Sequence, residues 1–293
     1  MKYYDCFMYF DEDMVLDLRL NILDRYVSKF IICEATYNHK GLKKKLNFNI
    51  QNFQKFKDKI IYIVLDKNSP DLIPIDDNDT LETKNKKILH NSINRDVYQR
   101  NHLMTEISKL DNEDLIFISD LDEIPNLENF KYKSKINVFV QDMFSYKFNL
   151  KLPNRKWIGS RACKKKHLVS PQWLRNIKNK SYPFWRLDTF FSNKKYMNLN
   201  YIENGGWHFT SIKTAQELFH KLTSFAHHLE FEESGLKLND IEEYIKKKKN
   251  FYNYSVDKKE KKYSGEESLI VENKDKLPKY ITDNIAKYKD WLA

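Results

Sequence analysis

The sequence predicts an α/β fold in which a parallel sheet is flanked by helices. Apolar runs of strand length alternate with helical apolar patterns from residue 3 to about residue 122, and this alternation is typical of a parallel sheet. Hydrophobic residues make up 41% of the 293 residues and aromatic residues 14%, so a substantial core can form. Only 6 Gly and 7 Pro are present and no linker is recognisable, so we expect one globular unit.

The N-terminal part contains several short apolar runs separated by helical patterns. Acidic residues that suit a helix N-terminus precede apolar residues at helical spacing from Val15 to Leu23. A second helical pattern covers residues 88–110, directly before the last run. The expected strands are residues 3–10, 29–34, 60–65 and 115–118.

The rest of the chain has a different pattern. Residues 136–148 are rich in β-forming side chains, and a cluster of Trp and Arg follows, so residues 126–230 are expected to form a loop-rich α+β half on an edge of the sheet. Helical patterns return over residues 214–230 and in a Lys-rich C-terminal segment. We therefore expect a single domain made of residues 1–125, residues 126–230 and a Lys-rich helical segment, residues 231–293.

The composition restricts the class of protein only in part. The formal net charge of +10 is compatible with nucleic acid, an anionic membrane surface or phosphorylated substrates, but the basic runs are dominated by Lys and are typical of solvated faces. Three widely spaced Cys without a Cys-x-x-Cys pair indicate neither a zinc knuckle nor a disulfide scaffold. No signal peptide or long apolar segment is recognisable, so we expect a soluble protein of a reducing compartment.

An acidic string ends the fourth expected strand. Asp120, Asp122 and Glu123 follow the apolar run, at the carboxyl end of a strand, where open α/β sheets bind their ligands. If the extended conformation persists, Asp120 and Asp122 face one side while Leu121 points into the protein. Two converging carboxylates favour a hard divalent ion such as Mg²⁺ or Mn²⁺ that bridges to a phosphorylated ligand. The alternative is a plain solvated turn, which Pro125 also suits.

Three further segments carry functional candidates, each with an ordinary alternative. Gly205 and Gly206 permit a close backbone approach or a positive φ, and the nearby His208 is either a packed histidine or a partner of the carboxylates on Mn²⁺. The polar loop that begins at Glu34 could hold a base and a ribose, or could simply connect two elements. Arg100 could pair with a diphosphate or form a surface salt bridge.

These segments, in this order, resemble glycosyltransferase family 17, which includes β-1,4-N-acetylglucosaminyltransferases. The most specific part is the string Asp-x-Asp-Glu-Ile-Pro, and the resemblance extends from about residue 3 to residue 230, with the Lys-rich tail outside it. The matching residues are Tyr4–Phe7 with Glu12 and Leu16–Arg19; Phe30–Glu34 with Thr36 and Gly41; Gln99–Arg100; Ile118–Pro125; Ser170–Pro171 with Leu174–Arg175; and Gly206–Phe209.

The resemblance implies a GT-A type fold, with a Rossmann-like sheet that binds a nucleotide sugar in residues 1–125 and an acceptor-binding half in residues 126–230. It implies a UDP-N-acetylglucosamine donor, an inverting transfer to a glycan hydroxyl, and a Mn²⁺ or Mg²⁺ ion on the diphosphate. Asp122 and His208 would be metal ligands, and Asp120 would contact the ribose or the metal's water. The residues expected to bind the donor are Glu34, Arg100, Asp120, Gly159 and Arg175.

Eukaryotic members of the family are anchored in the Golgi membrane, whereas this chain resembles bacterial or viral members without an anchor. The resemblance therefore implies a cytoplasmic protein, with a peripheral position at the inner membrane face as one form of this, and no nucleic-acid partner.

An inverting transfer also needs a carboxylate that removes the acceptor's proton. Glu123 is the first candidate because it adjoins the expected metal site, and Glu203 and Asp188 are alternatives. The main rival function is a metal-dependent nuclease or phosphoesterase, which would usually show more metal-ligating residues for two ions. A catalytically inactive, lectin-like sugar binder is the third class.

Overall fold

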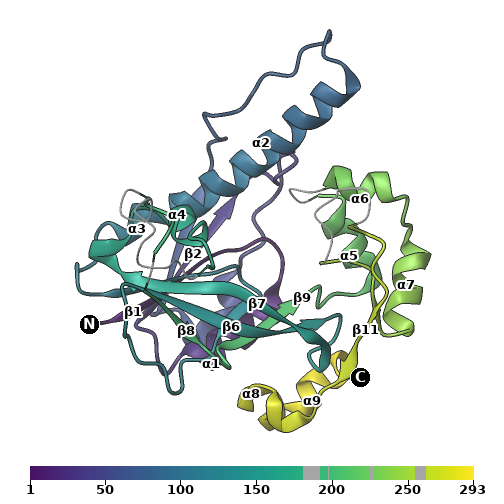
Figure 1. Cartoon of the computed structure of the whole chain (residues 1–293). Helices are drawn as coiled ribbons and strands as arrows, with labels where there is room; N and C mark the ends of the chain where they lie inside the picture. The colour runs from purple at the N-terminus through teal and green to yellow at the C-terminus, as the bar shows by residue number, and fades with distance from the viewer. Residues whose placement is uncertain (181–191, 197, 225–227, 255–261) are drawn as a thin grey trace.

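A ten-stranded mixed sheet lies at the centre of the molecule (Figure 1). The computed structural model of the chain describes residues 1–180, 192–196, 198–224, 228–254 and 262–293. The strand order is β3-β2-β1-β4-β7-β6-β9-β5, with β8 paired to β6 and β12 paired to β7. The strands are β1 (Tyr3–Met8), β2 (Lys29–Ala35), β3 (Ile60–Leu65), β4 (Leu115–Ile118), β5 (Glu123–Pro125), β6 (Ile136–Ser145), β7 (Leu150–Lys164), β8 (Leu199–Ile202), β9 (Gly206–Thr210) and β12 (Ile270–Val271).

The four strands β3, β2, β1 and β4 are parallel, as the sequence predicts. Successive side chains alternate between the two faces, so Phe30 and Ile32 lie in one core cluster and Ile31 and Cys33 in the other. Helix α1 (Asp13–Leu23) covers the first face with its apolar side chains. The second face packs against α3 (Met104–Ile107), α4 (Pro171–Arg175) and the end of α2 (Leu81–His102). The carboxyl ends of these strands therefore meet at one edge of the sheet.

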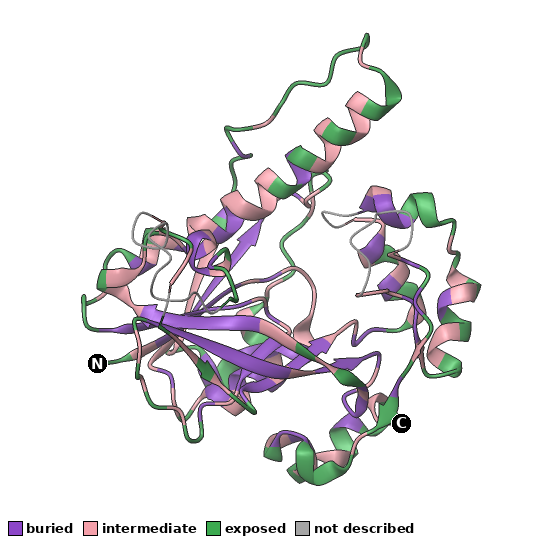
Figure 2. Cartoon of the chain, in the orientation of Figure 1, coloured by how far each residue is buried: buried purple, intermediate pink, exposed green. Residues whose placement is uncertain are grey.

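The helix expected over residues 88–110 is α2, which begins earlier and ends earlier than the pattern suggests. Thr80 caps its N-terminus by accepting a hydrogen bond from the backbone N of Thr83. The far end of α2 projects from the body of the molecule and is largely exposed, whereas the sheet is buried (Figure 2).

The remaining strands join the sheet mainly through β7, a strand that the sequence pattern does not reveal. Pro153 and several charged side chains interrupt its β pattern, yet it spans 15 residues and pairs antiparallel with both β4 and β6. The expected loop-rich half thus contains two long strands. Beyond β6, β9 lies parallel to it and antiparallel to β5, which brings His208 opposite Glu123.

The C-terminal segment contains strands as well as helices. Helices α5 (Ala215–Leu222), α6 (His228–Ser234) and α7 (Leu238–Lys246) lie beside the sheet (Figure 1) and share a third core cluster with Phe251, Tyr252 and Tyr263. Among the described residues, no helix is long and apolar enough to cross a membrane. The other elements are the strands β10 (Lys249–Asn250) and β11 (Glu267–Ser268), the helices α8 (Lys279–Asp283) and α9 (Ile285–Tyr288), and the 3-10 helices η1 (Ile50–Phe56), η2 (Lys165–His167), η5 (Lys274–Lys276) and η6 (Lys289–Trp291).

Candidate active site

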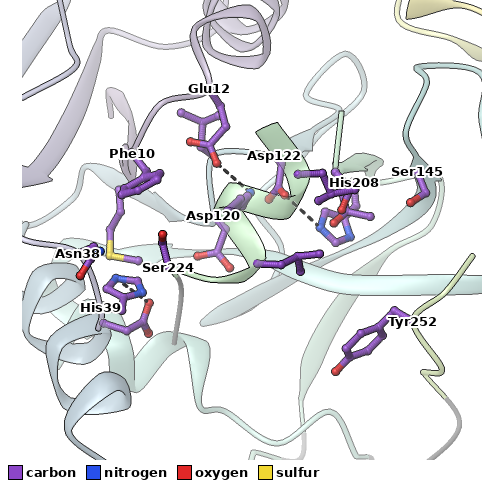
Figure 3. Close-up of a pocket in the computed structure, with 18 of the residues that line it drawn as sticks. Phe10, Glu12, Asn38, His39, Asp120, Asp122, Ser145, His208, Ser224 and Tyr252 are labelled. Carbon is purple, nitrogen blue, oxygen red and sulfur yellow. Dashed lines mark hydrogen bonds and ion pairs between the residues drawn. The ribbon is translucent and has the colours of Figure 1, made fainter. Parts of the chain in front are cut away.

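A cavity of about 850 Å³ opens where the parallel strands end, and we call it the central cavity. Its lining comes from the loops after β1 and β2, helix α2, the acidic string after β4, strands β6, β7 and β9, helix α5 and the C-terminal segment. In Figure 3, Asp120 and Asp122 lie between Asn38 and His39 on one side and His208 on the other. The position agrees with the rule that open α/β sheets bind ligands beyond the carboxyl ends of their strands.

The acidic string forms a tight turn instead of continuing as a strand. The backbone N of Glu123 donates to the carbonyl O of Asp120 at 3.0 Å, so the chain reverses at residues 121–122. Asp120 and Asp122 both line the cavity, as expected, although the conformation that places them there is not extended. Leu121 is only 5% exposed, which agrees with its predicted inward position.

Arg19 on α1 holds this turn from inside the protein. The fully buried guanidinium donates to the backbone carbonyls of Asp120, Leu121 and Glu123 at 2.9 to 3.0 Å. Its other nitrogens donate to both carboxylate oxygens of Asp5 at 2.6 and 2.8 Å, which balances the buried charge. Asp5 and Arg19 of the first motif therefore fix the shape of the acidic turn, and we call this pair the buried clamp.

Asp120 lies between two arginines. Its carboxylate accepts from Arg100 at 3.1 Å and from Arg175 at 2.8 Å. Burial alone would raise the pKa of Asp120, but the two guanidinium groups hold its pKa well below its usual range. Asp120 and Arg100 line the central cavity as expected, whereas Arg175 lies behind it, between Asp120 and Glu123.

Glu123, the first candidate for the catalytic base, is fully buried behind the cavity. Its carboxylate accepts from both terminal nitrogens of Arg175, from Trp157 Nε1 at 2.6 Å and from the backbone N of Asp120 at 2.9 Å. A Cβ built on Gly159 would lie 2.3 Å from this carboxylate, so the glycine makes the room that Glu123 occupies. These contacts favour positioning roles for Glu123 and Gly159 over direct contact with a substrate.

Among the described residues, one other candidate for the base and one candidate for donor binding also lie away from the cavity lining. Glu203 is exposed after β8 and is not part of the lining. Asp188 lies outside the described residues. Glu34 is fully buried, where it accepts from Tyr62 Oη at 2.8 Å and forms an ion pair with Lys44, whose side chain lines the cavity. Glu34 therefore fixes the loop after β2 rather than facing a ligand.

Asp122 and His208 form a pair at the floor of the cavity, with 3.6 Å between Asp122 Oδ2 and His208 Nε2 (Figure 3). Gly206 allows β9 to approach β5 so closely, because it has a φ of +125° and an added Cβ would lie 2.1 Å from the carbonyl O of Ile124. The His208 ring stacks on Trp157, and its buried Nδ1 has no hydrogen-bond partner among the described residues.

The donor set of Asp122 and His208 fits a divalent ion that completes its coordination with phosphate oxygens. Within the described residues, no group of three or more His, Cys, Asp or Glu side chains could hold a metal by itself. Ions such as Mg²⁺ commonly use one or two protein ligands together with substrate phosphates, and Mn²⁺ accepts both carboxylate and imidazole. The pair therefore suits an ion that binds together with a diphosphate.

The family model for glycosyltransferase family 17 matches residues 1–293. The chain belongs to glycosyltransferase family 17. No match was found among curated proteins. The mixed sheet flanked by helices is the GT-A-like fold expected of this glycosyltransferase. The family match also covers the Lys-rich tail, which corrects the expectation that the resemblance ends near residue 230.

Two groups of cavity residues in this family 17 glycosyltransferase escaped the sequence interpretation. The sequence indicates Glu12 as an acid near a helix N-terminus and as a residue of the family motif, yet it lines the cavity and accepts from Lys221 Nζ of α5 at 2.8 Å. Burial would raise the pKa of Glu12, but Lys221 and Lys213 lower it to about 2. The second group is the C-terminal wall, which we define as the lining residues 250–254 and 262–263. No local pattern in the sequence indicates either contact.

Proposed function

We propose that this glycosyltransferase transfers N-acetylglucosamine from UDP-N-acetylglucosamine to a glycan hydroxyl, with inversion and with the help of Mn²⁺ or Mg²⁺. The observation that carries the proposal is the acidic turn, which presents Asp122 beside His208 in a cavity large enough for a nucleotide sugar. Membership of the family supports glycosyl transfer, and the acidic turn in the cavity supports the proposal that a diphosphate binds there.

The metal would be held by Asp122 and His208. When bound, it would supply positive charge that stabilises the departing diphosphate. The chain supports this function with side chains that are already fixed: Arg19 shapes the turn, and Arg100 holds Asp120 at the cavity surface. Because these contacts exist before any ligand binds, little reorganisation is needed during the reaction.

The nucleoside would lie on the side of the cavity formed by the loops after β1 and β2. This side offers aromatic rings at Phe10 and Tyr37 and polar groups at Asn38 and His39 (Figure 3 labels all but Tyr37). Lys44, anchored by Glu34, adds a cation at the same side. An aromatic ring with nearby amides and a cation is a suitable environment for a nucleoside attached to a phosphate.

Removal of the acceptor's proton needs a carboxylate that faces the acceptor. The carboxylates that line the cavity in the described part of the chain are Glu12, Asp96, Asp120 and Asp122. Glu12 is a weak base because Lys221 lowers its pKa, and Asp96 and Asp120 are paired with Arg100. We therefore retain Asp188 as the proposed base. The activity of Asp188→Asn would be compared with that of Glu123→Gln, because the Glu123 carboxylate is enclosed by protein and does not face the acceptor.

The decisive experiment is incubation of the full chain with several UDP-sugars and Mn²⁺, with release of UDP as the readout. We expect release from UDP-N-acetylglucosamine that stops with EDTA and returns when Mn²⁺ is restored. Asp122→Asn should remove this activity, and Asp283→Asn, at an exposed surface position, is the matched control. No UDP release from any UDP-sugar, together with cleavage of DNA or of a phosphoester, would show that the nuclease alternative is right.

A further inference from the structure

A row of aromatic rings runs from His208 along one wall of the central cavity. The ring centroids of His208 and Trp157 are 4.7 Å apart, and those of Trp157 and Tyr254 are 6.4 Å apart. Tyr254 and Tyr252 follow at 4.6 Å, and Tyr252 and Tyr263 at 5.4 Å. All five side chains line the cavity, so the row continues from the candidate metal site into the C-terminal wall.

The aromatic row is not explained by the donor. The loops after β1 and β2 and the acidic turn already offer a complete set of contacts for a nucleoside diphosphate, and Tyr252 lies on the opposite side of Asp120 and Asp122 from Asn38 and His39 (Figure 3). Tyr252 and Tyr254 are half-buried in the absence of any ligand, so part of each ring faces the cavity. This half of the cavity therefore has room for a second substrate.

The charges around the row also indicate the chemistry of that substrate. Lys262 lines this wall, but its Nζ lies 3.3 Å from a carboxylate oxygen of the buried Glu230. Arg155 lies over the Tyr254 ring and is paired with Glu267 at 2.8 Å. Because carboxylates balance both cations, an anionic substrate would gain little electrostatic attraction here. The binding of a neutral substrate does not depend on such attraction.

We propose that Trp157, Tyr252 and Tyr254 form the acceptor subsite and that this subsite takes a neutral saccharide. Aromatic faces suit such a ligand because the C–H face of a pyranose buries apolar area against a ring while its hydroxyls stay at the edge. The position fits the chemistry, since the row begins beside Asp122 and His208, where the sugar would leave the diphosphate. The inference rests on the proposed function, because an acceptor is needed only if a sugar is transferred.

The test uses the full chain with Tyr252→Ala and Tyr254→Ala, with Tyr→Phe at each position and Tyr201→Ala as the control. Tyr201 is 37% exposed on β8 and is not part of the cavity lining. The probes are the neutral disaccharides chitobiose, lactose and cellobiose and the anionic trisaccharide 3′-sialyllactose. For each variant we would measure the dissociation constant of UDP-N-acetylglucosamine, the KM for each saccharide and the thermal unfolding temperature.

Loss of one ring should raise the KM for the best neutral saccharide by about tenfold, while the donor dissociation constant changes less than about twofold. The Phe variants should keep the wild-type KM, since they keep the ring, and Tyr201→Ala should do the same. Preference for 3′-sialyllactose, Ala variants that match Tyr201→Ala, or no binding of any neutral probe would overturn the inference.

Failure of the proposed function has a different signature. The donor would then neither bind nor release UDP in the wild-type protein, whatever the saccharide. Failure of the subsite alone would leave donor binding and UDP release intact in the wild type and would leave the KM of the Ala variants unchanged.

Discussion

The acidic turn at residues 119–125 and the C-terminal wall line opposite parts of the same cavity, yet they are built in different ways. Buried charges hold the turn: Arg19 bonds its backbone, and Arg175 joins Asp120 to Glu123. Packing of aromatic side chains such as Tyr252 and Tyr263 holds the wall. The turn therefore suits a ligand with charged groups that need a fixed position, and the wall suits a ligand that is recognised by its shape and apolar area.

Directional hydrogen bonds and ion pairs are concentrated at the turn, where charge develops in the proposed reaction. A fully buried guanidinium with six hydrogen bonds to the turn and to Asp5 leaves the backbone little freedom. Rings in mutual contact can slide with less loss of energy, since their contacts are not directional to the same degree.

Breaking the buried clamp should have the largest effect. Arg19→Met leaves the carboxylate of Asp5 buried without its partner, and the loss of a partner from such a pair typically lowers the free energy of unfolding by about 3 to 5 kcal/mol. Chemical denaturation measures this change. Arg25→Met is the control, because the Arg25 side chain is 68% exposed and should be neutral. Equal stability of the two variants would show that the clamp does not support the turn.

Removal of the proposed metal-binding carboxylate should affect activity and leave stability intact. Asp122→Asn keeps the size of the side chain but removes the charge beside His208, so we expect UDP release to fall by at least about a hundredfold. Asp122 is partly exposed and makes no ion pair with a Lys or Arg in the described part of the chain, so the unfolding temperature should hardly change. A large drop in the unfolding temperature would show that Asp122 stabilises the fold and would contradict its proposed role as a metal ligand.

The two regions also differ in how far they could be predicted. The turn follows a continuous apolar strand, so Asp120 and Asp122 could be placed at a strand end from local pattern alone. For His208, local pattern left a packed histidine and a metal partner as alternatives, because the pairing of β9 with β5 and β6 that brings it beside Asp122 has no local signal. The same reason applies to Glu123. Local pattern placed it beside the expected metal site, but its burial depends on Trp157 and Arg175, which lie far along the chain.

The C-terminal wall could not be predicted at all. Its residues lie in a stretch where Lys runs dominate, so its composition indicates a solvated surface, and its burial depends on packing against α5 and α7. The long strand β7 escaped prediction for a related reason, because Pro153 near its start and several charged residues hide a strand that is stabilised by two neighbours. Local propensity was overridden by tertiary pairing in both regions.

A smaller effect is expected where the turn meets β7. Gly159→Ala forces a methyl group against the Glu123 carboxylate, and overpacking of this kind costs typically about 1 to 3 kcal/mol of unfolding free energy. Glu123→Asp shortens the carboxylate and should make room, so the double variant should be more stable than the sum of the two single changes predicts. Thermal unfolding of the four proteins provides the double-mutant cycle. Additive losses would mean that the two residues do not share this space.

A comparably small effect is expected at the ion pair between Glu12 and Lys221. Glu12 follows β1, and Lys221 belongs to α5, which packs in the same core cluster as the C-terminal wall. The pKa of Glu12 is lowered to about 2 from its ordinary value of 4.5, because Lys221 and Lys213 outweigh the opposing effect of burial. The pair therefore stabilises the folded state fully above pH 4.5, and this contribution is lost as the pH falls from about 4.5 to about 2.

Lys221→Met should accordingly lower the free energy of unfolding at pH 7 by about 2 kcal/mol, and the difference from the wild type should shrink below pH 4.5. Lys247→Met is the control, because Lys247 and its partner Glu243 are both more than half exposed, with side-chain exposures of 58% and 59%. Urea denaturation between pH 7 and pH 3 measures both variants. If the loss of unfolding free energy in Lys221→Met stays constant over that range, the packing of the lysine stem, and not its charge, stabilises the contact between α5 and the loop after β1.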